Sequence, residues 1–161
     1  MDIIAHIGQI DESITYTDRP TVKVIIKRDT NVLLLNNGLL PGGGIDKNET
    51  DNDAIARELH EELGTTVRDV EEIGSVVQYR NFLNKRYIIN GYVATLTLGG
   101  GSTNSQDEGE AQFTQVWLPV GDALELVSNS ITIARTKPMN DDTNQGTLFN
   151  LVTTYELLKQ L

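Results

Sequence analysis

Short apolar runs separated by polar segments recur along the chain and predict a set of β-strands. A β-branched run at residues 21–26 and an apolar run at residues 32–35 are separated by five polar residues, which predicts a hairpin. Similar runs predict further strands at residues 74–79, 87–98 and 113–118. The Gly- and Ser-rich segment at residues 98–110 predicts a loop between the last two of these strands.

Three segments have the pattern of helices. Thr50 and Asp53 resemble a capping box, which predicts a helix over residues 51–63. Gly64 is placed to end this helix, because glycine adopts the left-handed conformation without steric cost. Two further helices are predicted, a short one at residues 123–127 and a one-faced one at residues 147–161 that we expect to pack on the sheet.

Composition narrows the kinds of site that the chain can build. With 161 residues it fits one domain, residues 1–161, and it contains no cysteine and only two histidines, so a bound metal is expected to have oxygen ligands. The net charge of −10 disfavours binding to a nucleic-acid polymer. No apolar run approaches the roughly 20 residues that cross a bilayer, and the first residues do not resemble a secretion signal. We therefore expect a cytoplasmic protein that does not contact a membrane.

The predicted helix at residues 51–63 carries a cluster of carboxylates. At 100° per residue, Glu58, Glu61 and Glu62 fall within an arc of roughly 100°, beside a separate stripe of apolar residues. Like charges three and four residues apart repel, so the cluster destabilises the helix unless cations compensate. Helix charge alone leaves two interpretations open, a solvated acidic face and a metal-binding face.

The residues around the cluster favour the second interpretation. The pattern G-x5-E-x7-R-E-U-x-E-E-x-G-U, in which U is a bulky aliphatic residue, is satisfied at eight of its nine constrained positions: Gly43, Glu49, Arg57, Glu58, Leu59, Glu61, Glu62 and Gly64. Thr65 departs from it, and we expect a small packing cost there. On this motif, and on the glycine-rich entry that precedes it, residues 19 to 118 resemble the Nudix hydrolase family.

The resemblance implies a fold and a chemistry. The fold is an α/β/α sandwich with a mixed central sheet, which the order of the elements also favours. The implied activity is hydrolysis of a pyrophosphate bond in a nucleoside diphosphate derivative by water attack at phosphorus, with Mg²⁺ or Mn²⁺ as cofactor. The implied metal ligands are Glu58, Glu61, Glu62 and the carbonyl of Gly43. Glu108 or Glu110 is a further candidate ligand or general base, and an acidic loop with no such role is the alternative.

The roles of the remaining motif residues follow from the same resemblance. Either Glu61 or Glu62 would accept the proton of the attacking water. Arg57 would orient Glu49 or a metal-binding carboxylate, although an ordinary surface ion pair is the alternative. A non-catalytic sensor that binds a metal-nucleotide complex on the same fold is the alternative to an enzyme.

The residues that select the substrate must lie outside the motif. Aromatic rings can stack on a base, and cationic side chains can bind phosphate oxygens. The candidate substrate-binding residues are Lys23, Tyr79, Arg80, Phe82 and Arg86. Hairpin packing with a solvated basic turn is the alternative, and the sequence slightly favours it. The partner is expected to be a small nucleotide, with nucleoside triphosphates, dinucleoside polyphosphates and nucleotide sugars all left open. A homodimer, which is common in the family, is also left open.

Overall fold

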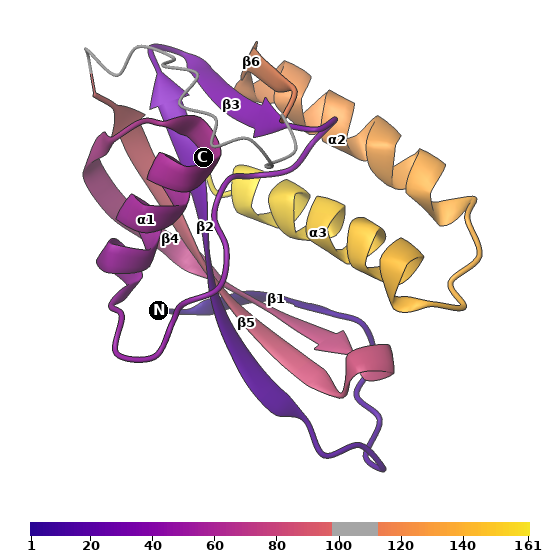
Figure 1. Cartoon of the computed structure of the whole chain (residues 1–161). Helices are drawn as coiled ribbons and strands as arrows, with labels where there is room; N and C mark the ends of the chain where they lie inside the picture. The colour runs from indigo at the N-terminus through magenta and orange to yellow at the C-terminus, as the bar shows by residue number, and fades with distance from the viewer. Residues whose placement is uncertain (98–112) are drawn as a thin grey trace.

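The computed structural model describes residues 1–97 and 113–161, which form one mixed sheet with helices on both of its faces (Figure 1). The strands are β1 (Ile3–Ile7), β2 (Thr17–Arg28), β3 (Asn31–Leu35), β4 (Val67–Arg80), β5 (Lys85–Leu96) and β6 (Gln115–Pro119). The helices are α1 (Asp51–Leu63), α2 (Val120–Arg135) and α3 (Asp142–Leu158), and a 3-10 turn, η1 (Asn81–Leu83), joins β4 to β5.

The six strands lie in the order β1-β4-β5-β2-β3-β6. β1 is parallel to β4 and β2 is parallel to β5, while the other neighbouring pairs are antiparallel. The predicted α/β sandwich with a mixed central sheet is therefore confirmed. No helix in the described ranges is long and apolar enough to cross a membrane.

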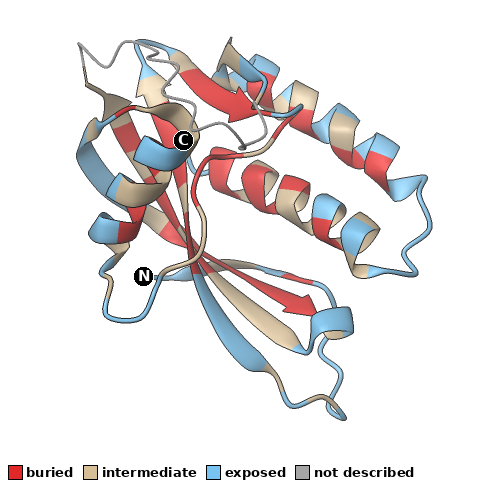
Figure 2. Cartoon of the chain, in the orientation of Figure 1, coloured by how far each residue is buried: buried red, intermediate tan, exposed pale blue. Residues whose placement is uncertain are grey.

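Alternate residues of β2 supply the two cores of the sandwich. Val24 and Ile26 pack with Ile55 and Leu59 of α1 on one face of the sheet. Ile25 points to the opposite face, into a cluster with residues of α2 and α3. The second halves of β2 and β4 are largely buried, whereas the first residues of β2 and much of the first half of β4 are exposed (Figure 2).

Several elements differ from their sequence-based predictions. β1 was not predicted, because Ile3 is exposed and the strand has no clear alternation of buried residues; its parallel pairing with β4 is a tertiary contact. The predicted short helix at residues 123–127 is part of the 16-residue α2. Polar residues at 128–130 interrupt the apolar pattern, but Ile131 and Ala134 beyond them are buried against α3 and extend the helix.

Candidate active site

α1 has the boundaries that its capping residues predict. The Thr50 side chain accepts a hydrogen bond from the Asp53 amide, and the Asp53 carboxylate accepts one from the Thr50 amide. Gly64 ends the helix in the left-handed conformation, with φ of 59°. Ile55 and Leu59 of α1 are buried against the sheet. The glutamates of α1 lie on another side of the helix, toward the loop that leads into it.

Arg57 connects this helix to that loop. Its Nε and Nη2 donate to the two carboxylate oxygens of Glu49 at 2.8 and 2.9 Å, and its Nη1 donates to Glu58 Oε1 at 2.7 Å. Nη2 also donates to the carbonyl of Gly44 at 2.9 Å. Hydrogen bonds from Arg57 are the main cause that lowers the pKa of Glu49 to about 2. Glu49 therefore remains a carboxylate at neutral pH and holds the guanidinium in a fixed plane.

Glu58 and Glu62 lie against consecutive glycines of the loop. A Cβ added to Gly43 would overlap the carboxylate of Glu58, so this carboxylate lies directly against the backbone of Gly43. Glu62 Oε2 accepts a hydrogen bond from the Gly42 amide at 2.7 Å. Glu61 is more exposed and lies 3.3 Å from Arg57 Nη1. The helix and the loop thus bring two carboxylates to adjacent residues, with a third beside them.

The glycine loop is itself held against β2. The Gly43 carbonyl accepts a hydrogen bond from the Val22 amide at 2.9 Å, and the Pro41 carbonyl accepts one from the Val24 amide at 3.0 Å. A carbonyl oxygen has two lone pairs, so the one on Gly43 retains a site for a second partner. Gly42 has φ of 113°, and a Cβ there would meet the backbone of β2, so this turn of the loop requires glycine.

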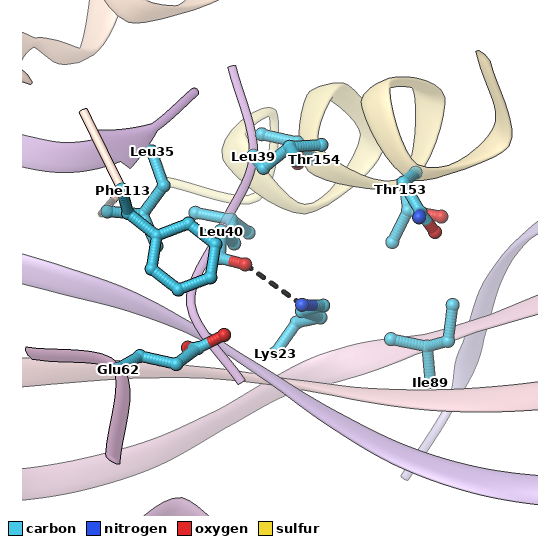
Figure 3. A pocket seen from close by; sticks show the side chains of 10 residues that line it. Lys23, Leu35, Leu39, Leu40, Glu62, Ile89, Phe113, Thr153 and Thr154 are labelled. Atoms are coloured by element: carbon cyan, nitrogen blue, oxygen red, sulfur yellow. Dashed lines mark hydrogen bonds between the residues drawn. The ribbon is translucent and has the colours of Figure 1, made fainter. Parts of the chain in front are cut away.

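Lys23 fastens the glycine loop to β2. Its Nζ donates to the Leu40 carbonyl at 3.0 Å (Figure 3) and also to the Gly42 carbonyl. Burial lowers the pKa of Lys23, while the charges of Glu62 and Glu58 oppose that shift. The ammonium group is therefore part of the scaffold that fixes the glycine loop.

A pocket of about 150 Å³ opens beside Lys23 and Glu62. Leu39, Leu40 and Phe113 form an apolar side, and α3 provides polar side chains on another side (Figure 3). The lining residues are Lys23, Leu35, Leu39, Leu40, Glu62, Ile89, Phe113, Asn150, Thr153 and Thr154. An apolar wall with a few polar groups is typical of a site for a small organic ligand.

The donor set suits a hard divalent cation. The oxygens of Glu58 and Glu62 lie against the backbone of Gly43 and Gly42, and such oxygen ligands are preferred by Mg²⁺ and Mn²⁺. Among residues 1–97 and 113–161, no three acidic or histidine side chains already converge as a metal cage. Glu58 and Glu61 also pair with Arg57, whose Nη1 lies 2.7 Å from Glu58 Oε1 and 3.3 Å from Glu61 Oε2.

Four predicted substrate-binding residues lie elsewhere, at the end of β4 and β5 that η1 joins (Figure 1). Arg80 is buried and forms a two-pronged ion pair with Asp142 at the start of α3. Arg86 pairs in the same way with Asp18. Tyr79 is buried against the rings of His6 and Tyr16, and Phe82 is exposed. The structure does not bring these four residues together with the glutamates, whereas it does so for Lys23.

Other residues near the site had no clear signal in the sequence. Asn150, Thr153 and Thr154 line the pocket from α3, and their polarity on an otherwise apolar helix face was the available sign. Arg19 on β2 lies against Gly44, and no motif includes it. Glu108 and Glu110 lie outside the described residues.

Known proteins are similar to this chain in sequence. A model of the NUDIX domain matches residues 17–136. An RNA pyrophosphohydrolase of Psychrobacter arcticus is 33% identical over 105 residues, which cover 53% of this chain and 60% of that protein. This chain thus spans less than two thirds of that relative's length.

Solved structures share the fold at low sequence identity. A MutT NUDIX hydrolase from Burkholderia pseudomallei has a TM-score of 0.53 and 19% identity, and the match covers 83% of this chain and 98% of that one. A NUDIX hydrolase from Nitrosomonas europaea has a TM-score of 0.56 and 16% identity, covering 70% and 79% of the two chains. Because the domain match spans most of the chain and includes the glycine loop and α1, this chain belongs to the Nudix family.

Proposed function

We propose that this chain is a divalent-metal-dependent hydrolase that cleaves a pyrophosphate bond in a nucleoside diphosphate derivative. The observation that carries the proposal is the position of Glu58 and Glu62 on consecutive glycines, with Arg57 beside them. The name of the Psychrobacter arcticus relative, an RNA pyrophosphohydrolase, supports the same class of bond.

The carboxylates would bind the cation and take up a proton. When bound, Mg²⁺ or Mn²⁺ neutralises diphosphate oxygens and makes a water molecule more acidic. Glu58, Glu61 and Glu62 provide oxygen ligands, together with the free lone pair of the Gly43 carbonyl. Glu61 or Glu62 accepts the proton that the attacking water loses as its oxygen bonds to phosphorus. The bond from that phosphorus to the bridging oxygen breaks, and one phosphate group leaves with the electron pair.

Two cationic side chains, Arg57 and Lys23, position the carboxylates and the glycine loop without contacting the reacting atoms. Arg57, held by Glu49, orients Glu58 and the Gly44 carbonyl. Lys23 ties down the carbonyls of Leu40 and Gly42 and so fixes the loop against β2. Both side chains would keep the carboxylates in place while the diphosphate binds.

The pocket beside Lys23 is the proposed site for the nucleoside. Phe113 and Leu39 offer an apolar surface to a ring, and Asn150 offers hydrogen bonds to its edge. A net charge of −10 favours a small nucleotide over an RNA chain, whose backbone requires a basic surface.

A substrate panel with matched variants tests the proposal. Nucleoside triphosphates, dinucleoside polyphosphates, nucleotide sugars and RNA with a 5′-triphosphate would be incubated with the protein and Mg²⁺ or Mn²⁺, and the products identified by mass. Glu58→Gln, Glu61→Gln and Glu62→Gln replace one oxygen of each carboxylate with an amide of nearly the same shape. Glu71→Gln, at an exposed position of β4, makes the same chemical change away from the site.

We expect the native protein and Glu71→Gln to release phosphate products at equal rates. At least Glu58→Gln and one of the other two site variants should be slower by about 100-fold or more, because a charged ligand or the general base is lost. Native rates in both Glu61→Gln and Glu62→Gln would refute the mechanism. Nucleotide binding with no turnover of any substrate would instead identify a nucleotide sensor.

A further inference from the structure

Arg19 lies in an unusually close position on the glycine loop. A Cβ added to Gly44 would overlap Nη2 and Cζ of Arg19, so the guanidinium lies directly against the backbone of Gly44. The backbones are also joined at this point, since Thr21 forms a bridge with Gly44 and the Ile45 amide donates to the Pro20 carbonyl at 3.0 Å. Arg19 is thus held where the loop crosses β2.

Arg19 differs from the other cations around the site in its partners. Arg57 is bound to three carboxylates, and Lys23 donates to two carbonyls. Arg86, at the neighbouring position of the sheet, pairs with Asp18. Among the ion pairs of residues 1–97 and 113–161, none involves Arg19, and its side chain is exposed. Within the described ranges this guanidinium thus has no charged partner, and its N–H groups can donate to an anion.

The position of Arg19 relative to the proposed metal ligands and the pocket indicates which anion it can bind. The Gly44 carbonyl is bound by Arg57, and the adjacent residue Gly43 carries the carboxylate of Glu58. Neighbouring Cα atoms are about 3.8 Å apart, so the guanidinium and the proposed metal ligands contact adjacent parts of the loop. Lys23, which lines the nucleoside pocket, is four residues along the same strand, roughly 13 Å away and on the same face.

The order along β2 is therefore the pocket at Lys23, the glutamates at Gly42 and Gly43, and the guanidinium at Gly44. A substrate whose nucleoside occupies the pocket and whose diphosphate reaches the glutamates would direct its outer end toward Arg19. We propose that Arg19 binds a terminal, unesterified phosphate of the substrate. This proposal rests on the proposed function and selects its substrate class, a nucleotide that ends in a free phosphate.

The chemistry of a terminal phosphate fits this guanidinium. Such a group carries a charge of about −1.5 to −2 at neutral pH and presents three acceptor oxygens, which a planar guanidinium can bind in pairs. An internal phosphate esterified on both sides has two free oxygens and one negative charge. In nucleotide sugars the outer end is an uncharged sugar, which offers Arg19 no charge to bind.

Variants of Arg19 would be compared on two kinds of substrate. Arg19→Ala removes the donors, Arg19→Lys keeps the charge without the planar fork, and Arg28→Ala removes the same charge from the end of β2 far from the glycine loop. Rates would be measured with ATP and with an ADP-sugar. Binding of their α,β-methylene analogues, in which the linkage between the α- and β-phosphorus atoms resists hydrolysis, would be measured by calorimetry in Mg²⁺.

For Arg19→Ala we expect kcat/KM on ATP to fall by about 10- to 100-fold, mainly through KM, with a matching loss in binding of the ATP analogue. Arg19→Lys should recover part of this loss, and Arg28→Ala should match the native protein. Activity and binding with the ADP-sugar should change by less than about threefold. Equal losses on both substrates, or no loss on ATP, would overturn the assignment.

The two proposals fail in different ways. If the native protein hydrolyses no member of the substrate panel, the proposed function fails, yet the calorimetry still tests Arg19. If the native protein binds only the ADP-sugar analogue, or neither analogue, the inference about Arg19 is wrong.

Discussion

Replacing Tyr92 with phenylalanine would remove one hydrogen bond beneath the start of α1. The Tyr92 hydroxyl donates to Asp51 Oδ2 at 2.6 Å, and the Asn90 amide donates to the same oxygen at 2.7 Å. Asn90 is itself held by the Ser75 hydroxyl at 2.9 Å. This chain of polar groups fastens the first residue of α1 to β4 and β5.

The size of the effect follows from the burial of the ring. Tyr92 is 6% exposed, and a hydrogen bond to a charged acceptor contributes about 1.5 to 3 kcal/mol. Tyr92→Phe should therefore lower the free energy of unfolding by about 2 kcal/mol at pH 8, which for a chain of this length corresponds to a fall in Tm of about 4 to 8 °C.

The same contact makes stability depend on pH in the alkaline range. Burial, followed by the hydrogen bond to Asp51, raises the pKa of Tyr92 above its usual value. The unfolded chain then loses this proton first, so the contribution of Tyr92 is complete below about pH 10 and is lost as the pH rises further. The native protein should lose stability between pH 9 and 11 more steeply than Tyr92→Phe.

Urea unfolding followed by the fluorescence of Trp117, the single tryptophan, measures both effects. Tyr155→Phe is the matched control, because the Tyr155 ring contacts Lys159 through its face and that contact survives the change. A Tyr92→Phe variant as stable as the native protein at pH 8, with the same slope against pH, would refute this account of the anchor.

Three further substitutions test other parts of the structure. Arg57→Lys should weaken Mn²⁺ binding, measured by calorimetry, by about 10- to 100-fold, because a lysine cannot hold several carboxylates at once; Arg68→Lys, at an exposed position, should leave it unchanged. Gly42→Ala should cost about 2 to 4 kcal/mol in urea unfolding, since its Cβ would lie 2.4 Å from a backbone oxygen of β2, whereas Gly121→Ala in α2 meets no atom within 4 Å and should not destabilise. Thr65→Val should increase the free energy of unfolding by about 0.5 to 1 kcal/mol and so raise Tm slightly, because the buried Thr65 hydroxyl makes a single long hydrogen bond of 3.5 Å. A lower Tm would contradict this expectation.

Local interactions explain why α1 could be predicted from the sequence to the residue. Thr50, Asp53 and Gly64 determine the ends of the helix through contacts with their own neighbours in the chain. The spacing of Glu58, Glu61 and Glu62 on one face follows from helix geometry alone. The motif that marks the family lies entirely in this segment and the loop before it, and the family prediction is confirmed by the match to the NUDIX domain.

Contacts between distant segments could not be inferred in the same way. The hairpin residues Tyr79 to Arg86 looked suitable for substrate, but Arg80 is taken up by Asp142, 62 positions further on. Asp142 is the first residue of α3, which begins five residues earlier than the apolar pattern predicted. The start of this helix is capped by Asp141, whose side chain accepts a hydrogen bond from the Asn144 amide. The parallel pairing of β1 with β4 also joins segments about seventy residues apart, and no pattern in either segment predicts this pairing.

The sequence by itself therefore determined the acidic helix, its caps and the chemistry that its glutamates can perform, because each depends on residues within one short segment. Only the tertiary structure decided which lysine and arginine side chains lie near that helix and its loop. Lys23 and Arg19 are both cationic residues of β2, and the sequence does not distinguish their roles. In the folded chain Lys23 donates to the loop carbonyls, whereas Arg19 forms no ion pair among the described residues. The physical reason is that an ion pair depends on distance in space, which the packing of β2, α1 and the glycine loop sets together.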